Sequence, residues 1–181
     1  MNSIKESVKK LDELSKQKKI RVISHYDTDG VTSAAIISRA LHRWNKSFSL
    51  QIVKGLEESI IKALPENEIL LFLDLASNSL DYLAQKNTEV FILDHHEIVQ
   101  KIPQNVTLIN PLLFKEEPLS GASICYLFAK SISPENRDLA TLAVIGMIGD
   151  TLETNLGKLS SEIIKDSETT IKRGLLLYPS T

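Results

Sequence analysis

The sequence has little that would place the protein outside the cell or in a membrane. It contains one cysteine, Cys125, so no disulfide can form within the chain. No apolar run approaches the ~20 residues that a helix needs to cross a bilayer. The polar start, residues 1–19, is also unlike a signal peptide. We therefore expect a cytoplasmic protein without a membrane partner, and Cys125 as a small buried residue of its core.

The chain also lacks an excess of basic residues. Its 21 Lys and Arg are outnumbered by 23 Asp and Glu, which gives a net charge of −2 and a pI of about 6.1. This balance excludes a broad basic surface of the kind that binds nucleic acid through charge alone. It leaves room for a local groove whose positive charge comes from bound metal ions.

What the chain does contain is an alternation of apolar and amphipathic segments. Its 181 residues, 43% of them hydrophobic, suffice for one soluble domain. Short apolar runs predict strands over residues 20–24, 48–53, 68–75, 89–94 and 106–110. Helical spacing predicts helices over residues 4–18, 31–44, 56–64, 79–86, 120–132, 134–150 and 159–176. The pattern indicates a doubly wound α/β fold, Rossmann-like, with a mainly parallel sheet and a helical second half.

Acids and histidines follow three of the predicted strands directly. His25, Asp27 and Asp29 come after the first strand, and Asp74 comes at the end of the third. Asp94, His95 and His96 follow the fourth. Ligands of open α/β sheets bind at the carboxyl ends of the strands, so these side chains are expected to converge at one edge.

A structural role would explain some of these residues taken singly. An aspartate after a strand often caps the next helix, and Asp74 alone would fit that role. A structural role explains the adjacent histidines His95 and His96 beside Asp94 least well. Three of the four histidines in the chain stand at the ends of predicted strands. The fourth, His42, lies on a predicted helix and is expected at the surface.

Together these groups predict a centre with two metal ions. Mixed carboxylates and imidazoles select divalent ions such as Mn²⁺, Zn²⁺ or Fe²⁺. Seven candidates exceed one tetrahedral site, and they suit two ions that share a bridging carboxylate. Asp150 joins the set because it ends an apolar helix in which Gly146 and Gly149 permit close backbone approach.

The motifs resemble those of the DHH phosphoesterases, in particular the RecJ-like branch. The four signature elements occur in order as HYDTDG (25–30), FLDLAS (72–77), LDHHE (93–97) and IGMIGDT (145–151). SGASICYLFAK (120–130) is similar to the Ser-Gly-Ala helix start of the family. Together these elements span most of the chain, and they are specific as a combination.

The resemblance implies a role for each residue of the centre. One ion would be held by His25, Asp27 and Asp74, and a second by Asp29, Asp74, His95 and Asp150. The implied ion is Mn²⁺, with Mg²⁺ as the alternative. Asp94 would orient the histidines beside it and His96 would contact the scissile phosphate, so both are candidate catalytic residues.

The family usually carries a second, C-terminal DHH-associated domain with a glycine-rich motif that holds substrate. This chain ends at GLLLYPST (174–181) without such a motif. We therefore expect residues 1–181 to form a single catalytic domain, with the DHH-associated domain either truncated from the chain, which the abrupt end after an apolar run favours, or carried by a separate chain.

Three functions are compatible with these motifs. The leading one is a 5′-exonuclease on single-stranded DNA or RNA, because His25 stands two residues before Asp27 as in RecJ-like proteins. The pyrophosphatase branch has its histidine four residues before that aspartate, where this chain has Ile23. A second reading is a phosphodiesterase of short oligonucleotides or nucleotides, which the acidic pI favours. A third is a replication scaffold, since archaeal RecJ-like proteins associate with the GINS complex.

Overall fold

The computed structural model describes residues 2–114, 117–152 and 156–167. The strands are β1 (Ile20–His25), β2 (Phe48–Val53), β3 (Ile69–Leu73), β4 (Val90–Leu93) and β5 (Val106–Ile109). All five lie parallel in one sheet, in the order β2-β1-β3-β4-β5. The predicted parallel, doubly wound sheet is therefore confirmed. The chain changes direction across the sheet between β1 and β3, which is where such folds bind their ligands.

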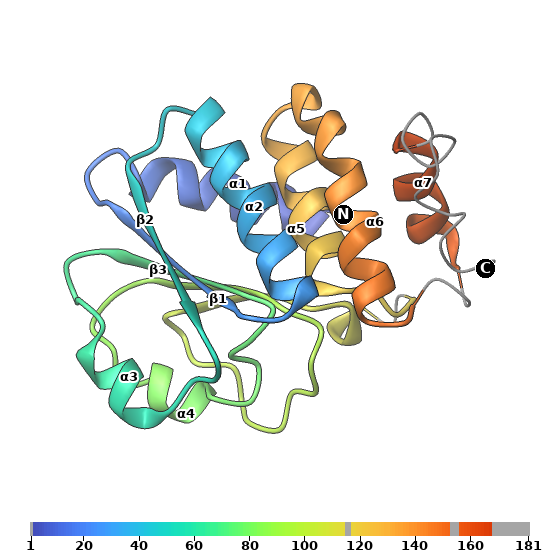
Figure 1. Cartoon of the computed structure of the whole chain (residues 1–181). Coiled ribbons are helices and arrows are strands. Elements are labelled where there is room, and N and C mark those ends of the chain that lie inside the picture. The colour runs from blue at the N-terminus through green and yellow to red at the C-terminus, as the bar shows by residue number, and fades with distance from the viewer. Residues whose placement is uncertain (1, 115–116, 153–155, 168–181) are drawn as a thin grey trace.

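Helices cover both faces of the sheet (Figure 1). In the first half of the chain they are α1 (Asn2–Leu14), α2 (Thr28–Arg43), α3 (Glu58–Ala63) and α4 (Leu80–Leu83). In the second half they are η1 (Pro111–Leu113), α5 (Gly121–Ile132), η2 (Pro134–Leu139), α6 (Ala140–Gly149) and α7 (Lys158–Asp166). α1, α2, α5 and α6 lie on one side of the sheet, and α3 and α4 lie on the other (Figure 1).

The strands are apolar on both faces because both faces are buried. In β3, Leu71 and Leu73 pack in the cluster beneath α2 and α5, which also holds Cys125. Leu70 and Phe72 alternate with them and pack in the smaller cluster beneath α3 and α4. Cys125 is buried and His42 is exposed, as predicted. No helix in the described part of the chain is both long enough and apolar enough to span a bilayer.

Several predicted boundaries were wrong. α2 begins at Thr28, three residues earlier than expected, because Asp27 caps it by accepting a hydrogen bond from Gly30 N. The predicted helix 134–150 is divided into η2 and α6; Ser133 and Pro134 start the first part as expected. α4 spans four residues where eight were predicted. The helix predicted over 159–176 is observed as far as Asp166, where it ends with Ser167 as its C-cap, and residues 168–176 lie outside the described part of the chain.

Candidate metal centre

The turn after β1 presents the first candidate residues. His25 is the last residue of β1, and its Nδ1 lies 2.7 Å from Asp27 Oδ2. Its Nε2 lies 3.2 Å from the carbonyl oxygen of Lys54, on the loop after β2. A Cβ at Gly30 would stand 2.4 Å from the carbonyl oxygen of His25. The tight passage from β1 into α2 therefore requires glycine at this position.

Asp29 points from the first turn of α2 into the protein, where it is 1% exposed. Its two oxygens accept hydrogen bonds from the backbone N–H groups of Gly121, at 2.5 Å, and Ala122, at 2.9 Å. A Cβ at Gly146 would lie 2.5 Å from Asp29 Oδ1. The starts of α2 and α5 and the body of α6 thus meet around one carboxylate, and the predicted close approach of α6 is confirmed.

Asp74 occupies the middle of the group. It is 2% exposed, and neither of its oxygens has a hydrogen-bond partner among the described residues. Its backbone has φ of 57°, a strained conformation for a residue other than glycine. Its Oδ2 lies 3.8 Å from His25 Nδ1 and its Oδ1 lies 3.3 Å from His95 Nε2. Burial, reinforced by the negative charge of Asp29, raises the pKa of Asp74 to about 7.

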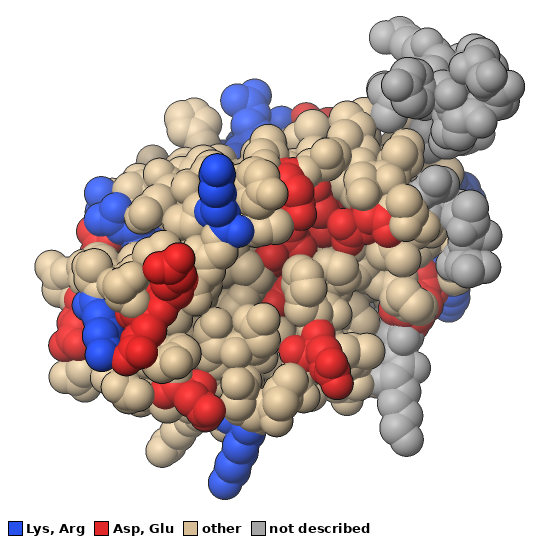
Figure 2. Space-filling model, turned by 60° about the horizontal axis from the view of Figure 1, so that its bottom comes forward, with Lys and Arg blue, Asp and Glu red and all other residues tan. Residues whose placement is uncertain are grey.

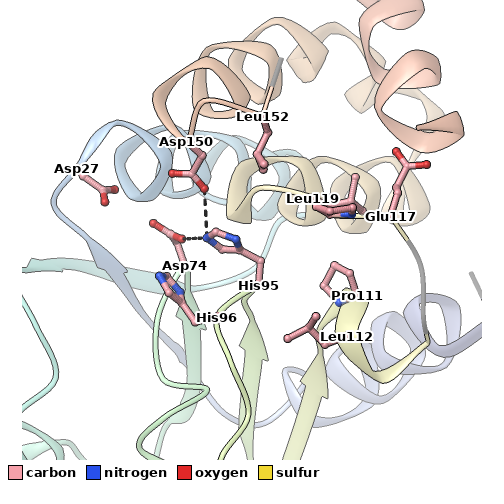
Figure 3. A pocket seen from close by; sticks show the side chains of 11 residues that line it. Asp27, Asp74, His95, His96, Pro111, Leu112, Glu117, Leu119, Asp150 and Leu152 are labelled. Atoms are coloured by element: carbon pink, nitrogen blue, oxygen red, sulfur yellow. Dashed lines mark ion pairs between the residues drawn. The ribbon is translucent and has the colours of Figure 1, made fainter. Parts of the chain in front are cut away.

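Asp150 completes this group from the end of α6. It is the C-cap residue of that helix, and its Oδ2 lies 3.2 Å from His95 Nε2. That oxygen is also buried without a hydrogen-bond partner in the described structure. Burial and the charge of Asp29 raise the pKa of Asp150 to about 6. Figure 3 shows one ring nitrogen of His95 facing both Asp74 and Asp150, with Asp27 across the pocket from Glu117.

Asp94 behaves differently, although it also follows a strand. It is fully buried, and it accepts hydrogen bonds from Ser77 N at 2.9 Å and His95 N at 2.8 Å. Its Oδ1 also lies 2.7 Å from His96 Nδ1. Burial alone would raise the pKa of Asp94, but the hydrogen bonds from His96 and Ser77 lower it to about 2. The hydrogen bond to Asp94 raises the pKa of His96 to about 9.

Two residues of this region were missed from the sequence. Asn110 is fully buried behind the histidines and donates through Nδ2 to the carbonyl of His96, at 2.8 Å, and to Ser77 Oγ, at 3.2 Å. The Asn-Pro step after β5 marks a turn, and that was its one signal. Glu117 lines the pocket and accepts hydrogen bonds from the backbone of Leu159 and Ser160. Nothing in its sequence context points to this position.

The side chains meet the chemical requirements of a divalent cation. Potential ligand atoms of His25, Asp27 and Asp74 lie within 4.8 Å of one another, as do those of Asp29, His95 and Asp150. Asp74 connects the two trios: it belongs to the first, and its Oδ1 lies 3.3 Å from Nε2 of His95 in the second. Carboxylates and imidazoles suit Mn²⁺ and similar ions, and a cation offsets the cost of burying carboxylate oxygens that accept no hydrogen bond. Asp74, Asp94, His95 and His96 form a further group with potential ligand atoms close together. In this group the oxygens of Asp94 already accept hydrogen bonds from the protein.

Two pockets flank this centre. The first, of about 270 Å³, is lined by Asp27, Asp74, His95, His96, Pro111, Leu112, Glu117, Pro118, Leu119, Asp150 and Leu152. The second, of about 280 Å³, is lined by His25, Gly55, Leu56, Asp74, Leu75, Ala76, Asn78, Ser79 and His96. Figure 2 shows a central group of acidic side chains on this face, with Lys and Arg set apart from it. The two pockets meet at Asp74 and His96.

Comparison with known proteins places this arrangement in a family. An uncharacterised protein of Methanocaldococcus jannaschii is 35% identical over 159 residues, which are 82% of this chain and 36% of that protein. The single-stranded-DNA-specific exonuclease RecJ of Thermus thermophilus is 29% identical over 169 residues, which are 83% of this chain and 25% of that enzyme. The chain thus spans about a third or less of the length of these relatives.

Solved structures show the same fold. A crystal structure of exonuclease RecJ bound to manganese superposes with a TM-score of 0.79 at 23% identity, covering 91% of this chain and 47% of that one. CDC45 from Entamoeba histolytica gives a TM-score of 0.69 at 17% identity, covering 94% and 38%. The DHH family, N-terminal domain, matches residues 19–147. The chain belongs to the DHH family, and its domain is RecJ-like.

Proposed function

We propose that this domain hydrolyses phosphodiester bonds of single-stranded nucleic acid with the help of two divalent metal ions. The observation that carries the proposal is Asp74, which is buried and strained and has neither carboxylate oxygen hydrogen-bonded to a described residue. It stands between His25 on one side and His95 on the other. A carboxylate in this setting suits a bridge between two cations.

The two trios support an assignment of the ligands. His25 and Asp27 would hold one ion with Asp74, and Asp29, His95 and Asp150 would hold the other with the same bridge. Asp29 retains lone pairs for this role although it accepts hydrogen bonds from α5. Mn²⁺ is the proposed ion, with Mg²⁺ as the alternative. When bound, such a pair supplies activation of water and stabilisation of the oxygens that attack and leave phosphorus.

His96 would act on the substrate, not on a metal. Its Nδ1 is engaged by Asp94, and its half-exposed ring lines both pockets. The raised pKa keeps the ring positively charged near neutral pH, so its free Nε2–H can donate to a non-bridging phosphate oxygen. Asp94 would hold that ring in place, and Asn110 would hold the backbone of the same turn.

The polymeric substrate is the finer part of the proposal. It is supported by the RecJ relatives, which are single-stranded-DNA-specific exonucleases by name. A small substrate is favoured by one observation: in the described part of the chain, neither pocket is lined by lysine or arginine. The scaffold function is supported only by the fold that the domain shares with CDC45. It would bring replication proteins such as GINS as partners.

One assay separates these functions. The protein is incubated with Mn²⁺ and single strands of DNA or RNA labelled at either end, beside labelled dinucleotides. We expect stepwise shortening of the strands, from the 5′ end, that stops when the metal is chelated. Cleavage of dinucleotides alone would favour the small-substrate function. If neither is cleaved while replication proteins are retained in a pull-down, the scaffold function replaces both.

A further inference from the structure

The second pocket is the part of this region that the proposed metal centre leaves without a role. The end of β1 and the loops that follow β2 and β3 form its walls, through His25, Gly55 and residues 74–76, 78 and 79. It shares only Asp74 and His96 with the first pocket. A phosphate held at those two residues would therefore have one pocket on each side. A phosphodiester carries two esterified groups, so it would place one of them in each pocket.

The two pockets differ in charge. Four carboxylates line the first: Asp27, Asp74, Glu117 and Asp150. Bound metal would neutralise three of these, but Glu117 is no candidate ligand; it is occupied by the backbone at the start of α7. Its negative charge would repel any further phosphate on that side. The second pocket has one carboxylate, the shared Asp74, beside two imidazoles and uncharged polar groups.

Hydrogen-bond donors are free in the second pocket. Asn78 is exposed, and its Oδ1 accepts from Ser79 Oγ at 3.3 Å. With that assignment, its side-chain N–H₂ group makes no hydrogen bond to the described residues. Its backbone carbonyl accepts from Gln100 Nε2 at 3.1 Å, which steadies the loop. The amide is thus held at the rim with two donors available to a ligand.

The shape of the wall also points to a ligand. Ala76, at the base, has φ of 91° and is 2% exposed, so the turn is strained at a second residue besides Asp74. Strain of this kind is retained at ligand clamps, where the surrounding structure compensates for it. A Cβ at Gly55, which also lines the pocket, would meet nothing within 4 Å, so the pocket is open there. Lys54, just before Gly55, is exposed.

We propose that the second pocket binds the nucleotide next to the scissile phosphate in a single strand, and that Asn78 donates hydrogen bonds to its sugar–phosphate backbone. The proposal rests on the proposed hydrolysis of phosphodiesters and deepens it. The strand leaves the centre through the pocket without Glu117, so its further phosphates avoid that charge. The pocket volume of about 280 Å³ lies near the lower limit for ligand sites, which suits a single nucleotide.

The test compares two kinds of substrate for the Mn²⁺-loaded protein, a simple diester and short oligonucleotides. Bis(p-nitrophenyl) phosphate offers the diester without a nucleotide, and ten-residue oligo(dT) and oligo(U) offer it with one. We expect Asn78→Ala to raise KM for both oligonucleotides about tenfold, the loss of about one hydrogen bond. KM for bis(p-nitrophenyl) phosphate should rise less than KM for the oligonucleotides, because this diester offers Asn78 no sugar or further phosphate. Asn78→Asp should raise KM further, because it places a carboxylate against phosphate.

Gln51→Ala is the matched control, an exposed amide on β2 that lines neither pocket. Unchanged KM in Asn78→Ala and Asn78→Asp, or equal effects on all substrates, would overturn the proposal. If the wild-type protein cleaves nothing, the proposed function fails. The pocket is then tested by fluorescence anisotropy of labelled oligo(dT) with Mn²⁺. Weaker binding by Asn78→Asp than by Gln51→Ala supports the subsite, and equal binding overturns it.

Discussion

Asp74 and Asp94 stand at equivalent places in the fold and have opposite environments. Each is the first residue after its strand, on the neighbours β3 and β4, and each is buried. The oxygens of Asp94 accept hydrogen bonds from Ser77, His95 and His96, whereas those of Asp74 accept none from described residues. The pKa of Asp94 is lowered to about 2, and that of Asp74 is raised to about 7.

The difference separates two uses of a buried carboxylate. Asp94 is satisfied by the protein itself, so its charge orders the turn that carries the two histidines. Asp74 is costly in the metal-free protein, because burial and the charge of Asp29 both oppose its ionisation. A cation would remove that cost. An aspartate after β4, Asp94, thus stabilises a turn of the protein itself, whereas the aspartate after the neighbouring β3, Asp74, is suited to binding a cation.

Replacing Asp74 should have the largest effect on activity. Asp74→Asn removes the proposed bridge while keeping the size of the side chain, so Mn²⁺-dependent hydrolysis should fall to background. Calorimetric titration should show lost Mn²⁺ sites. Asp81→Asn is the matched control, since Asp81 is exposed on α4 shortly after the same turn. Turnover within a few-fold of wild type in Asp74→Asn would contradict the two-metal centre.

Removing the imidazole that Asp94 holds should have the next largest effect. We expect His96→Ala to lower kcat by about 10²–10³-fold, the cost of losing one donor to the developing charge. Because His96 faces the substrate, the number of bound Mn²⁺ ions should not change. His42→Ala, at an exposed histidine away from the centre, should match the wild type. Loss of a Mn²⁺ site in His96→Ala would make His96 a ligand instead.

A smaller effect is expected when Asp94 itself is changed. Asp94→Asn places an N–H₂ group against the N–H donors of Ser77 and the histidine turn. Loss of the hydrogen bonds that orient a residue of the site typically lowers activity about 10–100-fold. The loss of charge-assisted hydrogen bonds should also lower the free energy of unfolding by about 1.5–3 kcal/mol. Urea titration measures this change, and an unaltered midpoint would show that Asp94 does not order the turn.

Much of the fold was predictable from residues close together in the sequence. Each strand is a short apolar run, and a parallel sheet with two covered faces needs such runs. The convergence of His25, Asp74 and His95 at one edge also followed from the sequence, because parallel strands end on the same side. Asp150 could be placed through the glycines of α6, which are local signals of close packing.

The environments of the individual carboxylates could not be predicted in this way. Asp29 is held by Gly121 and Ala122, more than 90 residues away, and no local pattern encodes that contact. Asp74 and Asp94 both read as an aspartate after an apolar strand that ends in leucine. What distinguishes them is the turn after β3, which takes positive φ at Asp74 and Ala76 and whose Ser77 N–H donates to Asp94.

The pH dependence of the stability of the metal-free protein tests the difference between Asp74 and Asp94. A carboxyl whose pKa rises on folding binds more protons when folded, so Asp74 should make stability fall as pH rises from about 4 to about 7. Asp94, whose pKa is lowered, should make stability rise from about pH 2 to about 4. Asp74→Asn should therefore be more stable than wild type at pH 8, by up to about 4 kcal/mol, since each pKa unit corresponds to about 1.4 kcal/mol. Thermal melts in a chelator measure both slopes. Equal melting temperatures of the two proteins at pH 8 would mean that ionised Asp74 carries no cost, and the case for a cation beside it would lose its main support.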